Sequence, residues 1–420
     1  MRFSRLDEWL TWLETLHPKK IDLGLERVAA VAERLGLIPP VATVITVAGT
    51  NGKGSSVAMM DAILRADGRR TGCYTSPHIH RYNERITIDG HSASDGDIVA
   101  AFAAIDTARL DISLSYFEFG TLAALWLFAR ERVDIIILEV GLGGRLDAVN
   151  IVDADIALVT SIGLDHVEWL GDSRDVISLE KVAIGRSDRP LVCGEPDPPA
   201  PMRAFVHERG MVGRFIGEDF TFSAGGQRWD WHGNGYDLLQ LPLPALAGAH
   251  QMQNAAAVLS VLTSLPAHLI PSRRAVETGL VQVQLAGRFE RMEIGFEVIL
   301  DVSHNPHGMQ KLVALLQESP VEGRTFVLFG VMADKDIDGL IQLMLPVVDE
   351  WIIVAPDFER ALPATDLLQR VVANDAGINA SLHGSVRDGL AFAKTALTAS
   401  DRLLVTGSFY TVAEVRELLI

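Results

Sequence analysis

A short glycine-rich segment, VAGTNGKGSS at residues 47–56, contains residue types that bind phosphate. Glycines let a chain turn its N–H groups inward without a Cβ clash, and those groups at a helix start attract anions. Lys53 adds a positive charge, and the Ser55 hydroxyl could reach a magnesium ion. The strict P-loop pattern does not fit, because Val47 replaces its first glycine and Gly54 separates Lys53 from Ser55. A plain glycine turn is the alternative, but the position between a strand and a helix favours a nucleotide site.

Polar residues also end other apolar runs. Glu139 closes VDIIILE, where a carboxylate is costly to bury without a cation or hydrogen bonds. We interpret it as a magnesium ligand, with a structural glutamate as the alternative. Ser76, Asp165 and His166 follow similar runs, and ligands of open α/β sheets gather at such strand ends. Magnesium prefers oxygen, so His166 could also be a capping or core histidine.

Two series of strands and helices must position these residues. Strands are expected in VATVITVAG, TGCYTS, VDIIILEVG and ADIALVTS, and from about residue 296 in FEVILDVS, RTFVLFGVM, WIIVAP, INASLHG and RLLVTGS. Their alternation with helical patterns predicts an α/β fold with parallel, Rossmann-like sheets. Residues 212–244 are expected to form antiparallel hairpins around Gly-Asn-Gly. We place two domains at residues 1–287 and 288–420.

Composition limits the classes of function. The net charge of −17 argues against nonspecific nucleic-acid binding, which depends on Lys and Arg. The two cysteines, Cys73 and Cys193, form no CxxC pair, so neither a disulfide framework nor a cysteine zinc site is expected. The long stretch 241–272 has no Asp, Glu, Lys or Arg, but it contains Pro, Gln, Asn and His and predicts a buried helix, not a membrane span. We expect a cytoplasmic monomer with small-molecule partners, no nucleic acid and no membrane.

Eight motifs follow one another along the chain in a consistent order. The first part of the chain contains GTNGKGS, TSPHIHRYNERI, LEVGLGGRLDAVN and SIGLDHVEWLG, and the second contains GRFE, DVSHNPHG, GVMADKD and GSF. Together they resemble the folylpolyglutamate synthase family of the Mur ligase superfamily. HPKKIDLGLERV and SLSYFEFGTLAALW resemble the bacterial bifunctional members, which also make dihydrofolate. The resemblance covers nearly the whole chain. It implies an N-terminal P-loop ATPase-type Mur ligase central domain and a C-terminal Rossmann-like Mur ligase domain, with ATP in the cleft between them.

The resemblance also implies roles for particular residues. ATP would be bound by Asn51, Gly52, Lys53, Gly54, Ser55, Asn254, Arg288 and Asp301. Two magnesium ions would be held by Ser76, Glu139 and His166. The pteroate pocket in the first domain would comprise Lys20, Ile21, Asp22, Ser115, Tyr116, Phe117, Glu118, Leu146, Asp147 and Ala148. Lys53 and His304, the latter near the γ-phosphate, would be catalytic together with a carbamylated Lys181, although KVAI replaces the usual K-A-G-I after that lysine.

The chemistry of these residues agrees with an ATP-dependent amide ligase. ATP would convert a carboxylate to an acyl phosphate, a transfer that needs cations around the γ-phosphate, and Lys53, magnesium and His304 fit that need. The amine of L-glutamate would then attack through a tetrahedral species that the same cations stabilise. We expect dihydropteroate to give dihydrofolate and tetrahydrofolate to give polyglutamates.

Three other functions are each compatible with part of the sequence but fit it less well. A cell-wall ligase of the same superfamily is disfavoured because no uridine-binding domain precedes the glycine-rich segment. A P-loop switch would hydrolyse ATP slowly without glutamate or pteroate. A dinucleotide oxidoreductase fails because no G-x-G-x-x-G follows FEVILDVS.

Three motifs also have purely structural interpretations. In DVSHNPHG, Asn305 suits a helix N-cap and Pro306 the first helical position. In GVMADKD, the two aspartates suit a helix N-terminus. Lys181 could be a helix-surface lysine paired with Glu180 or Asp175.

Overall fold

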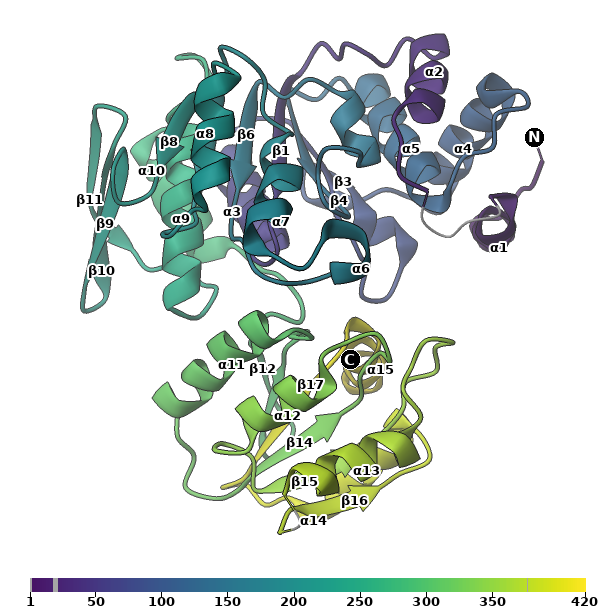
Figure 1. Cartoon of the computed structure of the whole chain (residues 1–420), viewed down its shortest axis with the longest axis vertical. Coiled ribbons are helices and arrows are strands. Elements are labelled where there is room, and N and C mark those ends of the chain that lie inside the picture. The colour runs from purple at the N-terminus through teal and green to yellow at the C-terminus, as the bar shows by residue number, and fades with distance from the viewer. Residues whose placement is uncertain (1, 18–21, 376) are drawn as a thin grey trace. The chain divides into compact units, whose positions relative to one another are not determined.

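The computed structural model describes residues 2–17, 22–375 and 377–420. The chain forms two compact units, residues 1–245 with 251–284 and residues 246–250 with 285–420 (Figure 1). The second unit also takes up residues 246–250, and the division into domains at residues 1–287 and 288–420 stays a prediction. Among the described residues, no helix has the length and apolar character needed to cross a membrane.

An eight-stranded sheet forms the centre of the first unit. Its strands are Thr43–Ala48 (β1), Thr71–Tyr74 (β2), Ile86–Ile88 (β3), His91–Ser92 (β4), Ile135–Glu139 (β5), Ile156–Val159 (β6), Pro190–Cys193 (β7) and Val212–Phe215 (β8). Their order is β4-β3-β2-β5-β1-β6-β7-β8, and every pairing is parallel except β2–β3 and β3–β4. Because β5 and β6 flank β1, the loops at the carboxyl ends of these three strands are neighbours.

Helices cover both faces of this sheet. They are Leu6–Leu16 (α1), Glu26–Arg34 (α2), Lys53–Ala66 (α3), Tyr82–Arg85 (η1), Asp95–Arg109 (α4), Tyr116–Glu131 (α5), Ala148–Ile151 (η2), Val167–Leu170 (α6), Arg174–Val182 (α7), Ala200–Glu208 (α8), Ala249–Leu262 (α9) and Arg273–Gln282 (α10). Helices α1, α2, α4, α5, α7 and α8 share one apolar core with the sheet. Figure 1 shows α7 and α8 in front of the sheet and α3, α9 and α10 behind it.

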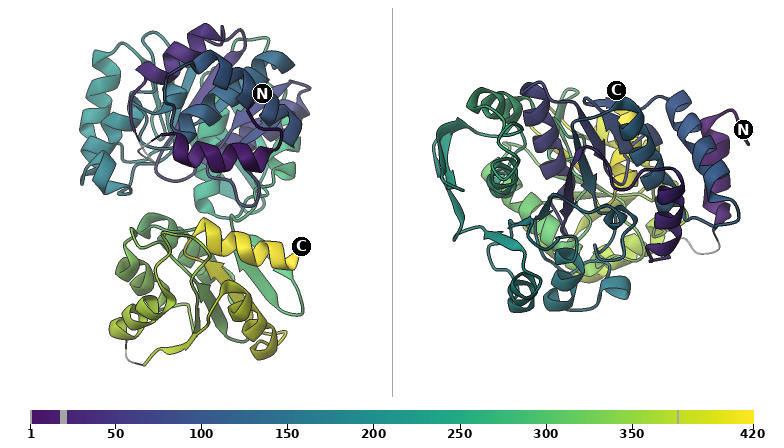
Figure 2. Two further views of the ribbon diagram at one scale, coloured as in Figure 1. Left: turned by 90° about the vertical axis from the view of Figure 1, so that its right-hand side faces the viewer. Right: turned by 90° about the horizontal axis from the view of Figure 1, so that it is seen from above.

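The region 212–244 differs in part from the prediction. Residues 212–215 form β8, which extends the large sheet in parallel and is not part of a hairpin. Only Phe220–Gly225 (β9), Arg228–Gly233 (β10) and Tyr236–Pro242 (β11) form the expected antiparallel ribbon (Figure 2). Asn234 and Gly235 turn between β10 and β11 with φ of 54° and 75°, as a type I′ hairpin requires. The ribbon is anchored to α9, because Trp231 Nε1 donates to Ala256 O at 3.0 Å.

The second unit is a smaller doubly wound sheet. Its strands are Glu290–Glu293 (β12), Glu297–Leu300 (β13), Thr325–Phe329 (β14), Glu350–Ile353 (β15), Asn379–Leu382 (β16) and Arg402–Thr406 (β17), in the order β12-β13-β17-β14-β15-β16. Only β12 is antiparallel to its neighbour. The helices are Pro306–Glu318 (α11), Ile337–Met344 (α12), Ala364–Asn374 (α13), Val386–Ala396 (α14) and Phe409–Leu419 (α15). Helices α11 to α13 pack in one apolar cluster, and α14 and α15 in another.

The structural interpretation of DVSHNPHG is confirmed. Asn305 caps α11 by accepting from Gly308 N at 2.8 Å, and Pro306 is the first helical residue. This helix start places residues 301–304 at the carboxyl end of β13, where ligands of such sheets gather.

Candidate active site

The glycine-rich loop joins β1 to α3 and needs its glycines for close contacts. A Cβ on Gly49 would lie 1.9 Å from Thr160 Oγ1, and a Cβ on Gly52 would lie 2.7 Å from Asn254 Oδ1. Both glycines also have positive φ, 152° and 88°. Gly54 lies outside this turn, in the first turn of α3, because that helix begins at Lys53. The loop therefore places a helix N-terminus directly at the end of the central strand.

The segment that follows β6 braces this loop. Thr50 N donates to Ser161 O at 2.8 Å, and Asn51 N donates to Ser161 Oγ at 3.1 Å. Thr160 Oγ1 donates to Asn51 O at 2.7 Å. Nothing in the local sequence of residues 47–56 indicated these partners, because they depend on β6 lying next to β1.

Lys53 is held inside the loop. Its Nζ donates to Gly49 O at 2.9 Å and to Thr50 O at 3.2 Å, and the side chain is partly buried. This arrangement differs from the solvated lysine of a plain glycine turn. It holds one positive charge at the point where the loop N–H groups and the helix N-terminus also favour an anion.

Two side chains from α9 lie against the same loop. Gln251 Nε2 donates to Ser55 Oγ at 3.2 Å, and Asn254 Nδ2 donates to Gln251 Oε1 at 3.0 Å. The structure thus brings Asn254 next to Gly52 and Ser55, although about 200 residues of chain separate them. Gln251 is a site residue that the sequence analysis missed, and only the motif around Asn254 could have drawn attention to it.

Glu139 has the surroundings expected of a metal ligand. It is the last residue of β5 and only 4% exposed, and Ser76 N donates to its Oε2 at 3.3 Å. The described residues contain no cluster of three or more His, Cys, Asp or Glu side chains that could hold a metal alone. Magnesium is usually held by one or two carboxylates together with water and substrate phosphates, so this donor set fits it.

His166 lies at the N-cap of the short helix α6. It has a positive φ of 51°, and its side chain is 41% exposed, with Nε2 4.0 Å from Asp165 Oδ1. A non-glycine residue in this conformation is uncommon and often has a functional reason. Its role as a metal ligand stays a prediction.

Asp147 organises the loop that follows β5. Its Oδ2 accepts from Gly141 N at 3.0 Å and Leu142 N at 2.9 Å, and its Oδ1 accepts from Val149 N at 3.0 Å. Burial raises the pKa of this carboxyl to about 6, although the three N–H groups and the charge of Lys53 act in the opposite direction. The bonds fix Leu146, which is half-buried, and Ala148, which begins η2, at the end of β5.

Lys181 is buried, so the interpretation as a helix-surface lysine is wrong. Only 4% of the residue is exposed, and Glu180 pairs with Arg145 instead, at 2.9 Å. The reason is the tight packing of the β5 loop on α7: a Cβ on Gly144 would lie 2.5 Å from Glu180 O. Burial lowers the pKa of Lys181 to about 7, with a further contribution from the charge of Lys53. Nearby Asp165 and Asp147 oppose this shift, so groups from three strand ends influence one amine.

The predicted pteroate residues that the structure describes form a connected network. Ser115 and Glu118 make a capping box at the start of α5. Arg27 joins two segments, since it lies 2.7 Å from Asp22 Oδ2 and 3.1 Å from Glu118 Oε1. Tyr116 and Phe117 follow in the first turn of α5, and Phe117 lies against Gly141 of the β5 loop. Lys20 and Ile21 lie outside the described residues.

Two residues of the second unit that we predicted to lie near ATP, Arg288 and His304, both lie beside Phe409. The Arg288 guanidinium lies 5.1 Å from the Phe409 ring centroid, and the His304 ring lies 5.8 Å from it. Asp301 accepts from Phe289 N and Ser303 N, both at 2.9 Å, and so ties the loops together. His304 Nδ1 lies 2.9 Å from Val302 O. Because a carbonyl only accepts, Nδ1 carries the proton.

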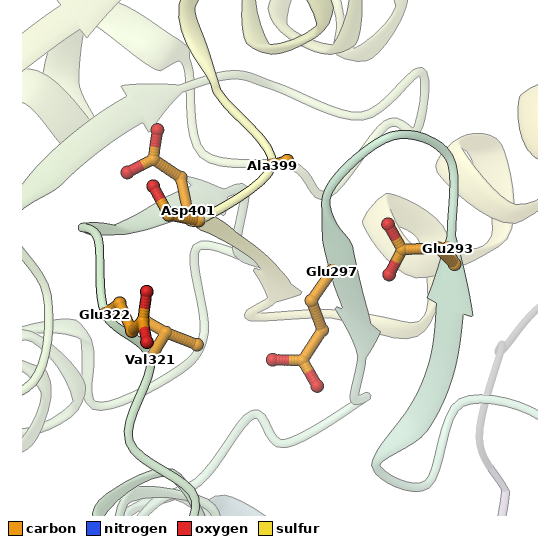
Figure 3. A pocket seen from close by; sticks show the side chains of 7 residues that line it. Glu293, Glu297, Val321, Glu322, Ala399 and Asp401 are labelled. Atoms are coloured by element: carbon orange, nitrogen blue, oxygen red, sulfur yellow. The ribbon is translucent and has the colours of Figure 1, made fainter.

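A cavity of about 250 Å³ in the second unit is separate from these residues (Figure 3). Acidic side chains surround it: Glu293, Glu297, Glu322 and Asp401. Glu297 is paired with Arg402 at 2.7 Å, and Asp401 accepts from Arg324 N at 2.7 Å. The cavity lies where β17 begins, at the opposite end of the strand from Thr406 and Phe409, and we assign it no role.

Glu195 also supports the glycine-rich loop, and nothing in the sequence indicated this role. Glu195 Oε2 accepts from Ile162 N at 2.9 Å, next to the residues that hold the glycine-rich loop, and Glu195 Oε1 lies 3.3 Å from Arg174. Because a charged hydrogen bond supports the loop indirectly, we expect Glu195→Gln to raise the KM for ATP about 10-fold. Steady-state kinetics with varied ATP would measure this.

The matched control is Asp197→Asn. Asp197 contacts the same arginine at 3.2 Å, but its side chain is 89% exposed, so its loss should have little effect. If the two variants behaved alike, Glu195 would not position the loop.

Comparison with known proteins agrees with this geometry. Residues 47–187 match the Mur ligase middle domain, and residues 287–409 match the Mur ligase glutamate ligase domain. The dihydrofolate synthase/folylpolyglutamate synthase of Escherichia coli (strain K12) is 42% identical over 99% of this chain and 96% of its own length. The chain belongs to this family of Mur ligases. The predicted family, fold class and ATP-dependent ligase activity are confirmed.

Solved structures of the family match almost the whole chain. A structure of E. coli FolC in complex with DHPP and ADP has a TM-score of 0.93 at 42% identity, over 99% of this chain and 98% of that chain. A bifunctional folylpolyglutamate synthase/dihydrofolate synthase with Mn, AMPPNP and L-glutamate bound has a TM-score of 0.91 at 40% identity, over 99% and 98%. The use of ATP and a divalent ion is thereby confirmed for the family, whereas the number of ions and the individual site residues stay predictions.

Proposed function

We propose that this ligase joins L-glutamate to dihydropteroate, giving dihydrofolate, and to tetrahydrofolate, giving its polyglutamates. One observation supports the proposal above the others. The glycine-rich loop and buried Glu139 lie at the ends of the neighbouring strands β1 and β5, and buried Lys181 of α7 is influenced by the charges of Lys53, Asp147 and Asp165, which follow β1, β5 and β6. Such a site can hold a nucleotide, a divalent ion and a carboxylate substrate together.

The reaction has two steps. A carboxylate oxygen of the folate substrate attacks the γ-phosphorus of ATP, the bond to the bridging oxygen breaks, and ADP leaves. The glutamate nitrogen then attacks the acyl carbon, loses a proton and expels phosphate, which leaves the new amide.

Different residues of this chain would bind phosphate, magnesium, the pteroate and the nucleotide. Lys53 and the loop N–H groups bind phosphate oxygens, and Ser76 and Glu139 would hold magnesium, which supplies charge neutralisation when bound. Asp147 and Asp22 stay proposed pteroate ligands, and Arg288 and Asp301 proposed nucleotide ligands. His304 stays a proposed catalytic residue near the γ-phosphate. The proposed enzyme is a cytoplasmic monomer with small-molecule partners.

A phosphate-release assay tests the proposed function. Release should require ATP, glutamate and either dihydropteroate or tetrahydrofolate, with a nucleotide-linked cell-wall precursor as the control substrate. Release that needed neither glutamate nor a pteroate would indicate a P-loop switch, and release with the cell-wall precursor alone would indicate the other type of ligase.

Substitution of Asp22 should reduce the activity with dihydropteroate more than the activity with tetrahydrofolate. Its carboxylate contacts His17 Nε2 at 3.1 Å and Arg27 at 2.7 Å, and so fixes the segment that we assign to the pteroate pocket. We expect Asp22→Ala to lower kcat/KM for dihydropteroate about 10-fold more than for tetrahydrofolate, in line with the loss of a charged hydrogen bond. Asp111→Ala, an exposed aspartate in a nearby loop, is the control. Equal losses for both substrates would show that the segment serves a shared element.

A further inference from the structure

Arg85 is an arginine without a carboxylate partner at the edge of the proposed pteroate pocket. Its Nε donates to His78 Nδ1 at 2.8 Å, and its guanidinium carbon lies 5.6 Å from the Tyr82 ring centroid and 5.7 Å from that of Tyr116. Within residues 2–17, 22–375 and 377–420, it forms no ion pair, and its two terminal nitrogens have no hydrogen bond. Buried arginines in proteins are normally paired, and Arg85 is partly buried.

The neighbouring Arg81 shows the contrast. It belongs to the same loop, but it pairs with Asp95 at 2.9 Å and its side chain is 67% exposed. Arg81 therefore has the ordinary environment of a surface arginine, whereas Arg85 is held between two aromatic rings and a histidine. These contacts restrict the guanidinium to one place and so prepare it for a ligand.

The position of Arg85 relates it to both parts of the proposed site. Thr75 N donates to Arg85 O at 2.9 Å, so Arg85 lies beside the strand end that carries Ser76, and Ser76 N in turn bonds Glu139. On its other side, Arg85 contacts the ring of Tyr116 in the first turn of α5. Arg85 thus lies between the candidate metal ligands and the segment assigned to pteroate.

Dihydropteroate and folates differ in the number of carboxylates that they would place near Arg85. Dihydropteroate has one carboxylate, and it is the group that reacts. A folate ends in glutamate and has a second carboxylate close to the reacting one. A guanidinium fork matches a carboxylate in size and can form two parallel hydrogen bonds with it.

We propose that Arg85 binds the non-reacting carboxylate of the terminal glutamate of a folate substrate, so that it serves chain extension and not the synthesis of dihydrofolate. This inference rests on the proposed function, because it uses the pteroate position at residues 115–118. Arg85 becomes a specificity-determining residue of the second reaction.

The test compares both reactions in the same preparations of the full chain. Arg85→Gln should lower kcat/KM for tetrahydrofolate about 10- to 100-fold, mainly through KM, the effect expected when one charged hydrogen-bonded pair is lost. The value for dihydropteroate should change less than about 3-fold, and Arg85→Lys should recover part of the loss because it keeps the charge. Arg81→Gln, which removes a paired surface arginine, should change neither value.

The outcomes that would overturn the role of Arg85 differ from the outcome that would overturn the proposed function. Wild-type protein that catalyses neither reaction would overturn the proposed function. If the wild type catalyses both and Arg85→Gln loses both equally, the proposed function stands and Arg85 instead binds the reacting carboxylate or supports the fold. Unchanged tetrahydrofolate kinetics in Arg85→Gln would also overturn the inference.

Discussion

Alanine at position 53 is expected to lower ATP-dependent phosphate release by at least about 100-fold, the usual effect of removing one group that stabilises transition-state charge. The Nζ of Lys53 lies 2.9 Å from Gly49 O, inside the loop that would surround the phosphates. The same charge contributes to the lowered pKa of Lys181 and opposes the rise that burial causes in the pKa of Asp147. Its loss therefore affects both the phosphate and the neighbouring titratable groups. Initial rates of phosphate release with saturating glutamate and dihydropteroate would measure the effect.

The fold should survive this substitution. Removal of Nζ loses two part-buried hydrogen bonds to Gly49 O and Thr50 O, so we expect the free energy of unfolding to fall by about 1 to 3 kcal/mol. Circular dichroism and thermal unfolding would check this. Lys394→Ala, an exposed lysine of α14, is the control for the loss of one positive charge. Near-normal phosphate release by Lys53→Ala would exclude Lys53 as a phosphate ligand.

The sequence was informative where a residue type conflicts with its local pattern. Glu139 ends a run of isoleucine and leucine, and the structure places it at the end of β5 as predicted. Asn305 and Pro306 indicate a helix start by local capping alone, and α11 begins there. These features depend on neighbours within a few residues, so pattern and propensity were sufficient.

The missed features depend on partners far along the chain. The brace at Ser161 needs β6 beside β1, and the contact of Gln251 with Ser55 spans 196 residues. The parallel pairing of β8 with β7 overrode the alternating pattern of residues 212–215, because the open edge of the large sheet offered a partner for this segment. The burial of Lys181 likewise follows from the β5 loop that packs on α7, and no periodicity within α7 indicates it.

Lys181 carries the second prediction with a very large expected effect. A lysine at its usual pKa is almost entirely charged near neutral pH and does not add carbon dioxide. The structure places Lys181 among buried groups, and burial lowers its pKa to about 7, so a large share of the amine is neutral. The neutral nitrogen can attack the carbon of carbon dioxide and release one proton, which gives a carbamate. That group would supply an oxygen ligand for a second magnesium ion, which His166 does not.

The pH dependence has a defined direction. The pKa is lowered, so the neutral amine increases as pH rises through about 7. At a fixed concentration of dissolved carbon dioxide, enzyme depleted of it should therefore regain activity faster at about pH 8 than at about pH 6, because more of the amine is neutral at the higher pH. Mass spectrometry of protein kept under carbon dioxide would detect the carbamate directly.

Substitution of Lys181 would test the carbamate most directly. Lys181→Ala should be inactive, at least about 100-fold below the wild type, because both the carbamate and its charge are lost. The space left beside Gly144 and Asp147 could admit a small anion, so short carboxylic acids such as acetate should partly restore the activity of this variant. Lys394→Ala should be active and should not respond to acetate. Full activity of Lys181→Ala in buffer free of carbon dioxide would exclude the carbamate, and the second metal ion would then have to take its oxygen ligands from water and ATP.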